Sequence, residues 1–90
     1  MIEREIIIEC DGGLHARNAI VLTDIASRYK SEITLTHAGV EGNAKSLLSV
    51  LMLGITSGAQ VTLRIFGSDE SDALLDILQL IENKFEVNQK

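Results

Sequence analysis

The hydrophobic pattern of the chain changes its period on the two sides of a glycine pair, Gly12 and Gly13. Before the pair, residues 2–9 alternate with the period of a half-buried strand. After it, over residues 16–30, apolar residues recur at helical spacing and predict one buried helix face: Ala19, Leu22, Ile25, Ala26 and Tyr29. The glycine pair therefore joins a strand directly to a helix.

The same two periods recur along the rest of the chain. Strands are predicted at residues 33–36, 40–43 and 60–66. A second helix over residues 47–53 stops at Gly54, and a third follows with the apolar stripe Ala73, Leu74, Ile77, Leu78, Ile81 and Phe85. The order β-α-β-β-α-β-α predicts an α+β fold, in which helices cover one face of an antiparallel sheet in two layers. We see no linker or repeat and expect one domain over residues 1–90.

The first two predicted helices begin with positive charge. Unpaired N–H groups and the macrodipole leave a helix start partly positive, so it attracts anions, phosphate above all. The third helix meets this field with three carboxylates: Asp69, Glu70 and Asp72. The first helix has His15 and Arg17 instead, and the second has Lys45 and Ser46. Cations at these ends favour an added negative charge, and we interpret His15 as a phosphorylatable histidine. A plain helix cap is the alternative.

Phosphoryl transfer needs mainly alignment and charge neutralisation. A neutral imidazole, whose reference pKa is about 6.5, is a nucleophile near pH 7. We therefore predict that His15 attacks and carries the phosphoryl group. The Arg17 side chain and the backbone N–H groups of Ala16 and Arg17 would stabilise the phosphoryl oxygens. The alternative for Arg17 is a solvated surface charge.

The helix over residues 47–53 is apolar nearly all round. If Val50 and Leu53 point inward, the remaining leucines stay exposed: Leu47, Leu48 and Leu51. Exposed apolar patches of this kind mark docking surfaces. Ile20 is also apolar on the solvent side of the first helix, where ordinary surface scatter is the alternative.

Composition narrows the class of partner and the compartment. With 13 acidic and 8 basic residues the net charge is -5, and only three aromatic residues occur, which argues against nucleic acid. The lone Cys10 fits a reducing cytosol, and no signal peptide is visible. We expect a cytoplasmic protein. His37 has no Cys or His at ligand spacing, so we expect a surface histidine and no metal site.

Three ordered blocks resemble the HPr family, the histidine-containing phosphocarriers of the bacterial sugar phosphotransferase system. They are Gly13-Leu14-His15-Ala16-Arg17, Asn43-Ala44-Lys45-Ser46-Leu47-Leu48 and Gly67-Ser68-Asp69-Glu70-Ser71-Asp72-Ala73. The resemblance implies the strand order 1-4-2-3 of an open-faced sandwich with three helices on one face. It also implies transfer from a phosphohistidine of enzyme I, through His15, to a histidine of a sugar-specific enzyme IIA. Such a protein is a phosphoryl carrier of the transferase class rather than a stand-alone enzyme, and it needs no metal or organic cofactor.

The resemblance includes the residues of the docking surface, and the chain differs from the family pattern at one position. Four residues match positions at which HPr-like proteins dock their partners: Ile20, Leu47, Leu48 and Leu51. This chain has Asn18 where the family usually has proline. Proline fixes φ in the first helical turn and lacks an N–H that would be unpaired there. We therefore expect a small loss of preorganisation and no loss of function.

Ser46 is expected to cap the second helix whatever else it does. The resemblance implies regulatory phosphorylation of Ser46 by HPr kinase/phosphorylase, with binding to a catabolite-control transcription factor. One alternative function is therefore a regulatory protein that acts through Ser46, although a related regulatory subgroup lacks the histidine that is present here. Another is a carrier for a specialised non-sugar relay. We expect a monomer, and the exposed apolar helix could support a weak dimer.

Overall fold

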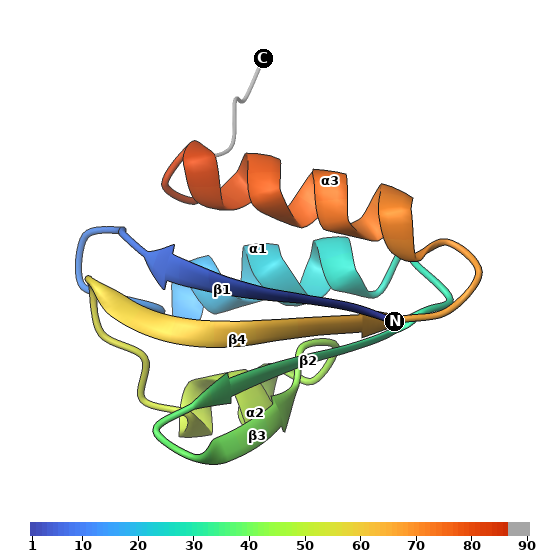
Figure 1. The fold of residues 1–90 in the computed structure, drawn as a ribbon. Coiled ribbons are helices and arrows are strands. Elements are labelled where there is room, and N and C mark those ends of the chain that lie inside the picture. Colours follow the sequence, from blue (N-terminus) through green and yellow to red (C-terminus); the bar gives the residue numbers. More distant parts are fainter. Residues whose placement is uncertain (87–90) are drawn as a thin grey trace.

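The computed structural model describes residues 1–86, which form four strands and three helices (Figure 1). In chain order these are β1 (Ile2–Ile8), α1 (Ala16–Ala26), β2 (Glu32–His37), β3 (Val40–Asn43), α2 (Leu47–Met52), β4 (Ala59–Phe66) and α3 (Glu70–Glu82). The predicted order of elements is confirmed. The first helix is shorter than its apolar pattern, because after Ser27 the backbone forms tighter three-residue turns, from Arg28 to Ile25 and from Tyr29 to Ala26.

The four strands form one antiparallel sheet in the order β1-β4-β2-β3 (Figure 1). One face is apolar and buried, and alternate residues of three strands supply it: Ile6, Ile8, Ile33, Leu35, Val61, Leu63 and Ile65. The opposite face is polar, with Glu5 of β1 accepting hydrogen bonds from Gln60 and Thr62 of β4. The predicted α+β sandwich and its strand order are thus confirmed.

The helices close the buried face of the sheet. Helix α1 contributes Ala19, Leu22 and Ala26 to the core, while Ile25 and Tyr29 are partly buried beside it. Helix α2 contributes Val50, with Leu53 directly after it, as predicted. Helix α3 buries Ala73, Leu74, Ile77 and Leu80. All of these residues belong to a single core.

The third helix ends before Phe85, which corrects the predicted apolar stripe. Lys84 and Phe85 have φ values of 56° and 64°. The N–H of Phe85 donates to the carbonyl of Leu80, and that of Lys84 to Ile81, both at 2.9 Å. This pairing is the Schellman pattern that ends many helices, here with lysine where glycine is usual. Phe85 therefore reaches the core through a chain reversal and is only 4% exposed.

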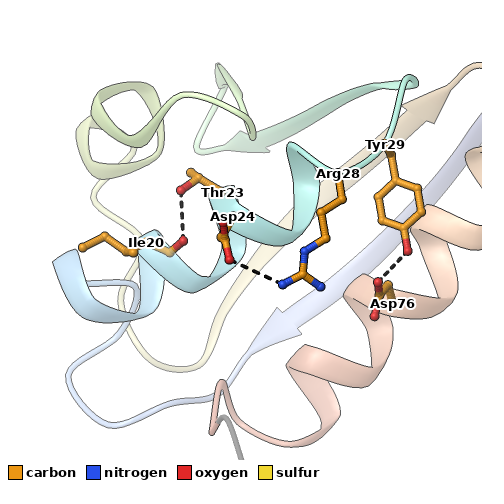
Figure 2. Close-up of polar contacts among 6 residues, drawn as sticks. All are labelled: Ile20, Thr23, Asp24, Arg28, Tyr29 and Asp76. Atoms are coloured by element: carbon orange, nitrogen blue, oxygen red, sulfur yellow. Dashed lines mark hydrogen bonds and ion pairs between the residues drawn. The ribbon is translucent and has the colours of Figure 1, made fainter.

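Four hydrogen bonds join the segment after α1 to α3 and to the residue that precedes it. The Tyr29 hydroxyl donates to Asp76 on α3 (Figure 2), and this hydrogen bond raises the pKa of Tyr29 to about 12. Asp69 accepts hydrogen bonds from the Ser31 hydroxyl and from the backbone N–H groups of Lys30 and Ser31. The Ser31 bond, followed by that of Lys30, lowers the pKa of Asp69. Asp69 therefore ties two loops together as well as standing at a helix start.

Candidate functional site

The glycine loop between β1 and α1 rests directly on the backbone before β4. Gly13 has a φ of 74°, and a Cβ atom there would lie 2.7 Å from the Ile55 carbonyl oxygen and 2.8 Å from the Thr56 Cα atom. The N–H of the next residue, Leu14, donates to that same Ile55 oxygen at 2.9 Å. Only glycine permits this approach, which sets the point where α1 begins.

His15 is the N-cap residue of α1, with extended backbone angles of φ -79° and ψ -179°. Its carbonyl accepts the first helical hydrogen bond, from the N–H of Ala19 at 2.8 Å. Within residues 1–86 its side chain caps no backbone N–H of the helix. Arg17 lies in the first turn, and both side chains are exposed. The structure thus places an exposed imidazole and a guanidinium at one helix start.

Asn18 contacts His15, although the sequence did not predict it as a site residue. Its side-chain nitrogen donates to the Gly13 carbonyl at 2.9 Å and lies 3.4 Å from Nε2 of His15. The residue is 9% exposed. Sequence alone pointed only to a missing proline, whereas the asparagine supplies a side-chain link between the loop and the helix.

Cys10 completes the support of the loop. Its thiol donates to the Gly13 carbonyl at 3.0 Å, so that this oxygen accepts from both Cys10 and Asn18. Cys10 is 6% exposed, and burial raises the pKa of its thiol. Cys10 is thus buried and hydrogen-bonded.

A cavity of about 680 Å³ opens beside His15. Two cations, Arg17 and Lys84, line it together with three carboxylates: Glu9, Asp11 and Glu86. Lys84 and Glu86 reach this place because of the reversal after α3. No sequence signal predicted their approach, since the reversal uses no glycine.

Three leucines of α2 are exposed, as their sequence pattern predicts. Leu47, Leu48 and Leu51 are 37%, 67% and 36% exposed, and Ile20 on the neighbouring helix α1 is 51% exposed. Met52 is also exposed, at 74%. We refer to these five residues as the apolar surface.

Ser46 and Lys45 at the start of α2 are both engaged. The Ser46 hydroxyl accepts from the N–H of Ser49 at 3.3 Å, which is the predicted cap. The Lys45 ammonium donates to the Tyr29 carbonyl at 2.6 Å, near the end of α1. Lys45 therefore joins α2 to the end of α1, a role that its position in the sequence did not indicate.

His37 is half-buried, and its Nδ1 atom lies 2.8 Å from the Leu53 carbonyl oxygen. Since a carbonyl can only accept, Nδ1 carries the proton in this contact. The expected plain surface histidine is therefore a structural one. In the part of the chain that the structure describes, no cluster of three or more His, Cys, Asp or Glu could hold a metal ion. Nor does any helix of residues 1–86 have the length and apolarity to cross a membrane.

Residues 2–83 match the family model described as "PTS HPr component phosphorylation site". The chain belongs to the HPr family. An HPr phosphocarrier protein from Xylella fastidiosa strain 9a5c is 39% identical over 85 residues, which are 94% of this chain and 96% of that protein. This HPr-family chain is thus similar to phosphocarriers of the phosphotransferase system over nearly its whole length.

Solved structures of the family share the fold. HPr-C-His from Thermoanaerobacter tengcongensis is 36% identical, with a TM-score of 0.92 over 99% of this chain and 100% of that one. The catabolite repression protein Crh of Bacillus subtilis is 30% identical, with a TM-score of 0.74 and the same coverage. Its crystal structure is described as a swapped dimer.

The close approach of Gly13 to the backbone before β4 can be tested by substitution. Gly13→Ala should destabilise this HPr-family protein by about 3 kcal/mol or more, because left-handed strain adds to a backbone overlap. Gly39→Ala is the matched control, since its φ is 82° but nothing lies within 4 Å of an added Cβ. It should cost only about 1 kcal/mol. Urea unfolding measures both, and equal losses would contradict the proposed role of the close approach.

Proposed function

We propose that His15 is the phosphoryl-carrying residue of a cytoplasmic HPr. It accepts the group from a phosphohistidine of enzyme I and passes it to a histidine of a sugar-specific enzyme IIA. The observation that carries this proposal is the exposed His15 ring at the start of α1, with Arg17 in the first turn and no acidic residue there. The residues of the site fit transfer of an anionic group.

The charges around His15 support a covalent carrier rather than a binder of free phosphate. Arg17 and the backbone N–H groups of Ala16 and Arg17 can stabilise a phosphoryl group on the ring. The three carboxylates of the cavity oppose the entry of a free dianion. A group delivered by a partner enzyme, directly onto the imidazole, needs no such entry.

The apolar surface supplies the docking site in this proposal. It lies on α1 and α2, the two helices that start with His15 and Ser46. Partner enzymes would bury Ile20 and the α2 leucines while their active site meets His15. We propose enzyme I and enzyme IIA as these partners, and a monomer as the working state.

Phosphoryl transfer should be specific to one of the two histidines. Incubation with phosphoenolpyruvate and a generic enzyme I should add one acid-labile phosphoryl group to the native protein, detected by intact-mass measurement. His15→Ala should abolish the addition, because the nucleophile is gone, whereas His37→Ala should keep it. Labelling that persists in His15→Ala would contradict the proposal, as would absence of labelling while a control carrier is charged.

A docking role of α2 can be distinguished from a general effect of removing any exposed leucine. Leu48 on α2 and Leu75 on α3 are both 67% exposed. Leu48→Ser should raise KM for the reaction with enzyme I about tenfold, since a buried docking leucine contributes more than 1 kcal/mol. Leu75→Ser should leave KM unchanged. Equal effects of the two substitutions would rule out α2 as the docking surface.

Ser46 is the proposed regulatory site, and the similarity to Crh, a catabolite repression protein, favours it. A phosphoryl group there would place negative charge at the start of α2, beside Leu47 and Leu48. HPr kinase and ATP should add an acid-stable phosphoryl group to native protein and to Ser49→Ala. Ser46→Ala should stay unmodified, and a modified Ser46→Ala would contradict this assignment. A regulatory partner, such as a catabolite-control transcription factor, would then recognise the phosphorylated form.

A further inference from the structure

We propose that Asn18 is a positioning residue that keeps Nε2 of His15 unprotonated and thereby prolongs the life of the phosphohistidine. The inference rests on the proposed role of His15 as the phosphoryl carrier. It concerns the position at which the resemblance to HPr implies proline, so it assigns a property to the asparagine found in this chain.

The orientation of the Asn18 amide follows from its neighbours. The Gly13 carbonyl can only accept a hydrogen bond, so the amide atom 2.9 Å from it is the NH₂ group. The same nitrogen lies 3.4 Å from Nε2 of His15 and has a second N–H to donate. Since an NH₂ group cannot accept, this contact favours a lone pair on Nε2 and disfavours a proton there.

The opposite edge of the ring is left for the phosphoryl group. A Cβ atom on Gly12 would lie 3.0 Å from Cδ2 and 3.7 Å from Nε2 of His15. The Cδ2–Nε2 edge therefore faces Gly12 and Asn18. Nδ1, the other ring nitrogen, takes part in no hydrogen bond within residues 1–86. Nδ1 is the nitrogen that this arrangement leaves for the phosphoryl group, and the proton that the neutral ring holds on Nδ1 must leave when the N–P bond forms. Asn18 therefore favours the phosphorylated ring with Nε2 unprotonated, at a small cost to attack by the free ring.

The protonation of Nε2 determines how easily the phosphoryl group leaves. In hydrolysis the N–P bond breaks, its electron pair stays on Nδ1, and the phosphoryl group passes to a water oxygen, which loses a proton and yields inorganic phosphate. If Nε2 already carries a proton, the ring leaves as neutral imidazole. If it does not, the ring leaves as an imidazolate and must take up a proton. By favouring the unprotonated ring, Asn18 slows loss of the group between partners.

Charged groups also line the cavity beside the ring. They are Arg17 and Lys84, and the carboxylates of Glu9, Asp11 and Glu86. The Cys10 thiol donates to the Gly13 carbonyl and not to the ring. Asn18 differs from all of these because it contacts Nε2 itself, from a buried position on a helix.

The first measurement uses unphosphorylated protein and does not depend on the proposed function. At about pH 9 a histidine ring is neutral, and the ¹⁵N shifts of His15 report which nitrogen holds the proton. Native protein should show more of the form protonated on Nδ1 than Asn18→Ala does, by about two- to fivefold, the range of a weak neutral hydrogen bond. The matched control is Thr23→Ala, which removes a side-chain bond to Ile20 from the same helix at equal burial (Figure 2). It should behave as native.

The second measurement follows loss of the phosphoryl group from protein charged with phosphoenolpyruvate and enzyme I. Asn18→Ala should release phosphate about two to five times faster than native protein and Thr23→Ala at neutral pH. If Asn18→Ala does not fold, Asn18→Pro replaces it, with the same expected result. Unchanged tautomers or unchanged lifetimes would overturn the inference. A protein that shows the tautomer shift but is never charged by enzyme I would instead refute the proposed function.

Discussion

The place of His15 depends on one backbone contact, the approach of Gly13 to the chain at Ile55 and Thr56. A side chain at Gly13 would overlap backbone atoms that cannot move without shifting β4. The hydrogen bond from Leu14 to Ile55 fixes the same contact from the other side. Because α1 begins immediately afterwards, this backbone contact fixes the position of the helix start. It therefore also fixes the position of the unpaired N–H groups and of the His15 ring. The Gly13 carbonyl then serves as the point where Cys10 and Asn18 hold the loop.

The sheet and the core keep the contact between Gly13 and the chain at Ile55 and Thr56 rigid. Strand β1 pairs over its whole length with β4, so the loop after β1 and the segment before β4 leave the sheet side by side. The N–H of Gly58 donates to Ile8 at 2.6 Å and closes this end of the pair. Leu14 and Ile55 are each 4% exposed, which anchors both segments in the core. An exposed imidazole is thus carried on a buried support, as precise group transfer requires.

Periodicity and the family resemblance together predicted the fold, because each strand and helix buries one regular face. The resemblance was needed for the strand order, since alternation shows which residues are buried but not which strands pair. The positions of His15, Arg17 and the α2 leucines also followed from local signals at helix starts and faces. The contacts of Asn18, Lys45 and Lys84 did not, because each joins segments that meet only in the folded chain. The helix end at Glu82 was missed because lysine, not glycine, adopts the left-handed turn.

The central claim is that His15 carries a phosphoryl group reversibly and is not merely modified. Its most direct test is the return of the group. Native protein charged by enzyme I and phosphoenolpyruvate would be freed of excess phosphoenolpyruvate and given enzyme I with pyruvate. The account predicts that the mass of one phosphoryl group is lost from the protein and appears as phosphoenolpyruvate. A phosphoryl group that stays on the protein, or leaves only as inorganic phosphate, would contradict it.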